Sequence, residues 1–217
     1  MFGGAPNWLA RFPSGHIVFG QGDHASLMYR VESGCVRLQV YGSEGTRQVV
    51  SFLFKGDLFG YGIEDRELSA EAVTDTVLRC WTISSVLTLG ARMPEVAITL
   101  IKAADHQVGE IAHHLEKVTH LSAADRVRWF LSGLVNCHGL LRSNGQLELP
   151  MTRRDIADYL GLSAETLSRA FNDLESEGFL EREGRRGLRL RGLSLELKVR
   201  SEGDLEVRSN GHAGLAS

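Results

Sequence analysis

Cysteine is scarce in this sequence, and long uncharged apolar runs are absent. The three cysteines, Cys35, Cys80 and Cys137, are widely spaced in 217 residues. Their odd number and spacing exclude a disulfide framework and a CxxC metal site, so we expect small buried side chains. No run of about 18 apolar residues predicts a transmembrane helix. Since no basic segment with a following apolar stretch opens the chain, we expect no signal peptide and a cytoplasmic protein.

A strong net charge is also lacking, because the chain carries only −3 at pH 7. This excludes a protein that binds anions over its whole surface. The charge is uneven, however. The segment 182–191 has one acidic residue, Glu183, and a group of arginines: Arg182, Arg185, Arg186, Arg189 and Arg191. Such a local cationic patch indicates an anionic partner bound at one end of the molecule.

Residues 14–84 have the pattern of a β structure. Short runs alternate apolar and polar residues, and glycine-bearing turns separate them. The expected strands are 16–19, 27–32, 35–41, 48–54, 69–73 and 77–83. Regular short strands of this kind predict a sandwich or jelly-roll barrel, which we place at residues 1–93.

A long helix is predicted at residues 94–120, with Pro94 at its first position. Its apolar residues alternate in spacings of four and three, as in a coiled coil, and predict the interface of a homodimer. An ordinary core helix is the alternative. Ile98 and Leu100 lie off this seam and are expected to face the barrel. The seam consists of Ala97, Ile101, Ala104, Val108, Ile111, Leu115 and Val118.

A further helix over about 124–135 is followed by a helix-turn-helix at 152–171. Thr152 is placed to cap the first helix of the motif and Ser163 the second, while Gly161 supplies a left-handed turn between them. Ala157 is small where the two helices cross. Together with two strands at 178–191, these features predict a winged helix-turn-helix domain over residues 121–192.

The outward residues near the start of the second helix are placed to contact bases in the major groove. Arg169 can donate two hydrogen bonds to guanine, Glu165 can accept from cytosine, and Ser168 can reach a base or a phosphate. A simple Glu165–Arg169 helix pair is the alternative. Expected contacts to the DNA backbone are Thr152, Arg153, Arg154, Ser163, Thr166, Arg185 and Arg186.

These motifs resemble the CRP/FNR family of transcription regulators over about residues 10–192. Residues 152–162 and 165–169 look like the FNR and FixK branches. The resemblance implies an α+β fold: a cyclic-nucleotide-binding-like β jelly-roll barrel that acts as sensor, a dimerisation helix and a winged helix-turn-helix. It also implies an activator that contacts RNA polymerase and double-stranded DNA. Because Ala164 stands where CRP has an arginine, we expect a TTGA-N6-TCAA-like palindrome.

The resemblance weakens where family members bind effectors. Cyclic-nucleotide-binding relatives have a glutamate after the Gly-Asp-x-x-Gly turn, where this chain has Tyr61, and an Arg-Ser pair, where it has Leu68 and Ser69. Arg66 is nearby but out of register. No cysteine precedes Cys35, so the four-cysteine iron–sulfur cluster of FNR cannot form. We therefore expect neither cyclic AMP nor an iron–sulfur cluster, and no cofactor.

Two modes of control remain open: a FixK-like mode without a ligand, or an effector-gated switch that holds haem or responds to oxygen or nitric oxide. His106, Glu110 and His113 or His114 share a helical surface that can bind a metal, although a solvated face is the simpler interpretation. A cupin-type enzyme is a further alternative for a jelly roll, but the barrel region of this chain lacks the His-x-His pair that a cupin metal site needs. We therefore expect no enzyme. Residues 193–217 are expected to form a flexible tail.

Overall fold

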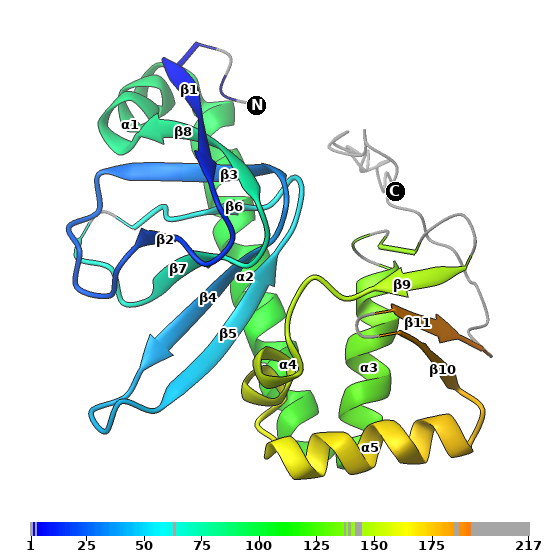
Figure 1. Cartoon of the computed structure of the whole chain (residues 1–217). Helices are drawn as coiled ribbons and strands as arrows, with labels where there is room; N and C mark the ends of the chain where they lie inside the picture. The colour runs from blue at the N-terminus through cyan, green and yellow to red at the C-terminus, as the bar shows by residue number, and fades with distance from the viewer. Residues whose placement is uncertain are drawn as a thin grey trace, which may run out of the picture.

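The chain folds into a β-barrel and a smaller helical region, and one long helix runs along both (Figure 1). The computed structural model describes residues 2, 4–62, 64–136, 138, 140–141, 145–184 and 187–191. The expectations for Cys137, Arg185, Arg186 and the tail 193–217 lie outside the described residues.

The barrel consists of two four-stranded antiparallel sheets, which is the double-sheet arrangement of a jelly roll. One sheet has the order β1 (Asn7–Phe12), β8 (Thr76–Thr82), β3 (Leu27–Ser33) and β6 (Leu58–Phe59). The other has β2 (Ile17–Phe19), β7 (Ser69–Ala72), β4 (Val36–Tyr41) and β5 (Arg47–Leu53). The sequence predicted six of these strands and missed β1 and β6.

Apolar side chains from both sheets fill the barrel. Alternate residues of β3, β4 and β8 point inward, and the Tyr29 and Phe59 rings stack with their centroids 5.1 Å apart. Cys35 and Cys80 are buried, as expected. Burial raises the pKa of Cys80 to about 11, which keeps its thiol protonated and unreactive. Gly34 has φ +93°, and a Cβ there would lie 2.6 Å from the Asp75 carbonyl oxygen, so this turn requires glycine.

Two helices follow the barrel. The sequence prediction missed α1 (Ile83–Arg92), whose N-cap Thr82 accepts a hydrogen bond from the Ser85 amide. The predicted long helix is α2 (Pro94–His120). Leu100 packs with the cluster around Met28 and Trp81, as expected, but Ile98 is exposed and does not face the barrel. Among the described residues, no helix combines the length and apolarity that a membrane span requires.

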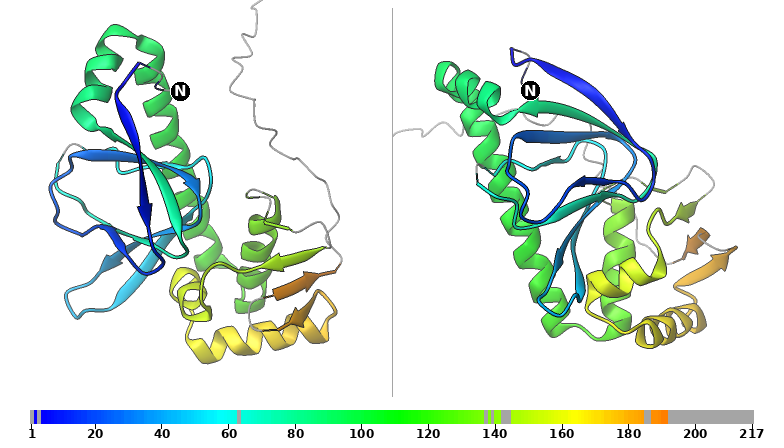
Figure 2. Two further views of the ribbon diagram at one scale, coloured as in Figure 1. Left: turned by 45° about the horizontal axis from the view of Figure 1, so that its top comes forward. Right: turned by 60° about the vertical axis from the view of Figure 1, so that its left-hand side comes forward.

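The helical region comprises α3 (Ala123–Asn136), β9 (Gln146–Glu148), α4 (Arg153–Leu160), α5 (Ala164–Ser176), β10 (Leu180–Glu183) and β11 (Gly187–Leu190). The three strands form one antiparallel sheet in the order β10-β11-β9. Figure 2 shows α4 against the β5 edge of the barrel and α5 on the outside. Cys35, Val49, Phe52 and Phe54 of the barrel belong to the same buried cluster as the helical region, so the two parts share a core.

Candidate nucleic-acid interface

The helix-turn-helix forms as predicted because its local signals agree. Thr152 and Asp155 make a capping box at the start of α4. Gly161 ends that helix at φ 63° and ψ 39°, in the left-handed region. The Ser163 hydroxyl then accepts from the Thr166 amide at 3.1 Å and caps α5. The inward residues predicted for both helices are buried: Ile156, Ala157, Leu160, Leu167, Ala170, Phe171 and Leu174.

The outward face of α5 carries the residues that the sequence assigned to base contact. Glu165, Ser168 and Arg169 are exposed. Arg169 and Glu165 form an ion pair one turn apart, and their side chains are 73% and 74% exposed. The pair therefore lies in solvent with both charged ends available, and a contact to DNA bases stays a prediction.

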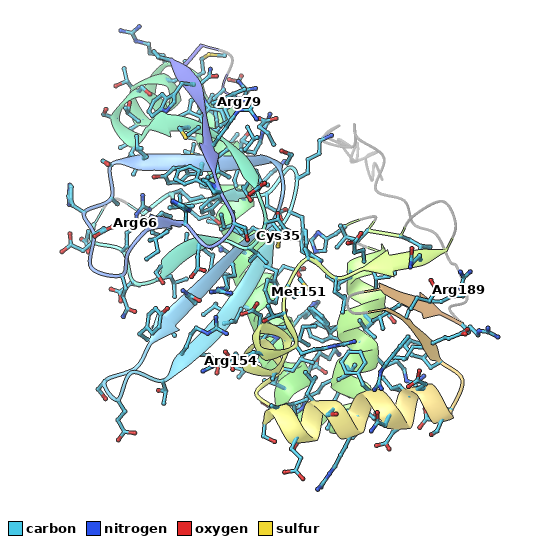
Figure 3. The ribbon with its side chains drawn as sticks, viewed as in Figure 1. Cys35, Arg66, Arg79, Met151, Arg154 and Arg189 are labelled. Carbon is cyan, nitrogen blue, oxygen red and sulfur yellow. The ribbon has the colours of Figure 1, made fainter. Side chains whose placement is uncertain are left out.

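The two arginines at the start of α4 differ in environment. Arg154 is exposed (Figure 3). The Arg153 guanidinium lies over the Phe171 ring, 3.6 Å from its centroid, and its Nη1 is buried without a hydrogen-bond partner among the described residues. Burial, with a contribution from the Arg182 charge, lowers the pKa of Arg153 to about 10. Arg153 remains a cation at neutral pH, with one donor unused.

The wing is less cationic than its sequence indicates. Arg189 Nε donates to Glu183 at 2.6 Å, and Arg191 Nη2 donates to Glu181 at 2.6 Å. Arg182 Nη2 donates to the Asn172 side chain at 2.6 Å and also faces the Glu175 carboxylate. Each described wing arginine therefore has a carboxylate partner, and the patch inferred from composition is partly neutralised.

The seam predicted along α2 is an open apolar face. Ile101, Val108, Ile111 and Leu115 are between 42% and 68% exposed. Ala97, Ala104 and Val118 are half-buried. Large exposed apolar side chains that recur at coiled-coil spacing are typical of an interface rather than of a solvated helix.

The polar side chains at and near the expected nucleotide positions of the barrel contact other parts of the protein. The Ser69 hydroxyl, in the family's clamp position, donates to the Gln39 carbonyl instead. Arg66 lies within the barrel (Figure 3), where its guanidinium donates to the Leu27 carbonyl and covers the Phe19 ring. Tyr61 contacts Gln107 of α2. Tyr61, Arg66 and Ser69 thus all use their polar groups in contacts within the protein.

The histidines of α2 do not assemble a metal site. The His114 ring stacks on Tyr159 of α4 with centroids 4.1 Å apart, so it turns toward the helix-turn-helix. His106, Glu110 and His113 are exposed. Within the described ranges, no three His, Cys, Asp or Glu side chains lie close enough together to bind a metal ion.

An ion cluster that the sequence analysis did not predict joins the barrel to α4. Arg37 and Arg47 of the barrel reach Asp155 and Asp158 of α4. Residues more than 100 positions apart meet here. Local patterns place Asp155 only as a capping residue, so they do not reveal this second role.

Comparison with known proteins identifies the two halves of the chain. A cyclic nucleotide-binding domain model matches residues 9–92, and a Crp-like helix-turn-helix domain model matches residues 125–194. The nitrogen fixation regulation protein FixK of Rhizobium meliloti (strain 1021) is 34% identical over 177 residues, which are 81% of this chain and 79% of FixK. The chain belongs to the CRP/FNR family of transcription regulators.

Structural similarity agrees with this CRP/FNR membership. The structure of FixK2 from Bradyrhizobium japonicum matches with a TM-score of 0.80 at 33% identity, and the match covers 86% of this chain and 93% of that one. The transcriptional activator protein FnrA of Stutzerimonas stutzeri is 28% identical over 177 residues, 79% of this chain and 72% of FnrA. The predicted barrel, long helix and helix-turn-helix are confirmed, and the homologues are DNA-binding regulators rather than enzymes.

Proposed function

We propose that this CRP/FNR regulator is a homodimeric activator that binds a TTGA-N6-TCAA-like palindrome without a bound effector. The observation that carries the proposal is the exposed set Glu165, Ser168 and Arg169 at the N-terminal half of α5. Arginine donates two hydrogen bonds to guanine O6 and N7, and glutamate accepts from the cytosine amine. The ion pair between them holds the arginine near the helix before DNA arrives.

Contacts to the DNA backbone would fix the register of α5 in the groove. Thr152 and Ser163 stand at the N-termini of α4 and α5, where amides and helix dipoles favour phosphate. Arg154 is exposed, and Arg153 keeps an unused donor. The remaining proposed backbone contacts are Thr166, Arg185 and Arg186.

Dimerisation would place two α5 helices in successive major grooves. Two copies related by a two-fold axis can pair along the α2 seam, where Ile101, Val108 and Leu115 leave apolar surface in water. A symmetric dimer of this type reads half-sites about one helical turn apart, and its site is a palindrome. The apolar seam of α2 is unfavourable in water, and pairing with a second copy would bury it.

Control without an effector is supported by the barrel interior. Arg66 and Ser69 make hydrogen bonds to barrel carbonyl groups, and Tyr61 contacts α2. A ligand phosphate would have to displace these contacts. The protein's activity would then follow its abundance, with RNA polymerase as the partner of the DNA-bound dimer.

Fluorescence anisotropy with a labelled TTGA-N6-TCAA duplex tests the proposal. We expect affinity well above that for a scrambled duplex, with a dimer in sedimentation velocity. The control duplex reverses one half-site, which keeps composition but removes the two-fold symmetry. Equal affinity for all three duplexes would refute the site. A Soret band, or affinity that depends on added haem or cyclic AMP, would favour the effector-gated mode instead.

A further inference from the structure

Helix α4 is held between the barrel and the recognition helix α5. One face of α4 packs on α5, and the opposite face contacts β5. The contact to the barrel is centred on four charged side chains, Arg37, Arg47, Asp155 and Asp158, which we call the α4 latch. Any position that the latch imposes on α4 is passed to α5 through their shared core.

The two oxygens of the Asp155 carboxylate have different tasks. Oδ2 accepts from the Thr152 amide at 3.0 Å and from its hydroxyl at 2.7 Å, which caps α4. Oδ1 accepts from Arg37 Nη1 at 2.7 Å and from Arg47 Nη2 at 2.8 Å. Only 2% of the Asp155 side chain is exposed. One buried carboxylate therefore joins the N-terminus of α4 to two strands of the barrel.

The second half of the latch lies one turn along α4. Arg47 Nε donates to Asp158 Oδ2 at 2.9 Å, and Gln48 of β5 donates to the Asp158 carbonyl. Arg37 also has partners within the barrel: a Glu71 carboxylate oxygen lies 2.8 Å from its Nη2, and the Gln39 side chain accepts from its Nε at 2.8 Å. These contacts fix the direction in which the two arginines point from the barrel toward α4.

Aromatic rings complete the contact. Tyr159, the residue after Asp158, lies 5.4 Å from Phe52 of β5 and 4.1 Å from His114 of α2, measured between ring centroids. The barrel, the long helix and α4 therefore meet at one point. Apolar packing supplies attraction here but little direction, whereas ion pairs with fixed donors specify register.

We propose that Arg37 and Arg47 are positioning residues for DNA binding: they fix the orientation of α4, and through it of α5, on the barrel without a bound effector. The inference rests on the proposed function for its consequence at DNA. Its physical basis is separate, since the ion pairs of the latch join α4 to the barrel before any DNA is bound. A buried ion pair adds little net stability over an apolar contact, so orientation is the better account of it.

Charge reversal of one pair tests the latch in the full-length protein. The variants are Arg47→Glu, Asp158→Arg and the double variant that restores an ion pair with opposite polarity. The matched control is Arg79→Glu, because Arg79 of β8 pairs with Glu32 of β3 at 2.7 Å, far from α4 (Figure 3). Arg47→Gln and Asp158→Asn replace the reversals if either prevents folding.

Hydrogen–deuterium exchange without DNA is the first measurement. We expect amide exchange in residues 153–160 to rise by about tenfold in each single variant, because each brings like charges together in the part-buried latch: a glutamate at position 47 against Asp158, or an arginine at position 158 against Arg47. The double variant should return it toward the wild-type rate, and Arg79→Glu should leave α4 unchanged. Unchanged exchange in both single variants, or a double variant no better than the singles, would overturn the latch.

Anisotropy with the palindromic duplex is the second measurement, and its sign is decisive. Asp158→Arg adds positive charge, so simple electrostatics would tighten DNA binding. Loss of orientation instead weakens it, by about tenfold if α5 must be reoriented at a cost near 1.4 kcal/mol. Tighter binding by Asp158→Arg would overturn the positioning role. A wild-type protein without palindrome preference would end the proposed function but not the exchange result, which is obtained without DNA.

Discussion

Replacing Arg169 with alanine separates the two roles that its ion pair with Glu165 can have. Both side chains are about three-quarters exposed, at 73% and 74%. An exposed helix pair of this spacing stabilises a helix by only about 0.2–0.5 kcal/mol. A bidentate contact from arginine to guanine discriminates by about 1–3 kcal/mol, which is roughly 5- to 150-fold. The two roles therefore differ in magnitude and in what they affect.

Anisotropy with two duplexes measures the difference directly. One duplex is the palindrome, and the other has the guanine of each TTGA half-site replaced by adenine. We expect wild-type protein to prefer the first by at least about tenfold, and Arg169→Ala to bind both nearly equally. The matched control is Arg128→Ala, which removes one cation from an exposed pair with Glu177 on the same helical region. If Arg169→Ala kept the wild-type preference, the base contact assigned to it would be wrong.

Three further substitutions have definite expected outcomes. Leu115→Asp should give monomers in sedimentation velocity, whereas Leu87→Asp, at a similarly exposed position on α1, should not. Asp155→Asn should lower the free energy of unfolding in urea by about 3 kcal/mol at pH 7. Burial raises the pKa of Asp155, but hydrogen bonds from Thr152 and the charges of Arg37 and Arg47 outweigh it and lower the pKa below its ordinary value of 3.8. The stability that Asp155 adds to the wild-type protein is therefore fully present above pH 3.8, and it disappears as pH falls through the lower pKa of the folded state. Burial lowers the pKa of His114 from its ordinary value of 6.5, and a hydrogen bond with the Tyr159 backbone opposes this more weakly. The free energy of unfolding of the wild-type protein should therefore fall as pH drops below 6.5, and urea titrations should show that His114→Phe removes this loss.

The elements that the sequence predicted best have their causes close together in the chain. Thr152, Gly161 and Ser163 each act within one helical turn, so their residue types alone placed α4 and α5. The spacing along α2 likewise depends only on the helix period. Where the cause was distant, prediction failed. β1 is a strand because it pairs with β8, from Asn7 opposite Trp81 to Phe12 opposite Thr76, and β6 spans only two residues.

The site divides in the same way. Exposure of Glu165, Ser168 and Arg169 follows from helix geometry and was predictable. The pairing of wing arginines with Glu181 and Glu183 was not, because composition counts charges without placing them. Arg37 and Arg47 are unremarkable residues of a hairpin until folding brings Asp155 to them. Sequence patterns indicate which residues can read DNA, but tertiary structure decides what holds them in place.

The paired wing arginines also set how DNA affinity should depend on salt. If only the four other proposed cations, Arg153, Arg154, Arg185 and Arg186, reach phosphates, a dimer makes about eight such contacts, and log K should fall with log salt at a slope near −7. Participation of Arg182, Arg189 and Arg191 would steepen the slope to about −13. Anisotropy titrations over a salt series distinguish these values. A slope near −13 would mean that the wing carboxylates release their arginines on binding, and a slope near −7 that Arg182, Arg189 and Arg191 stay paired with their carboxylates in the complex.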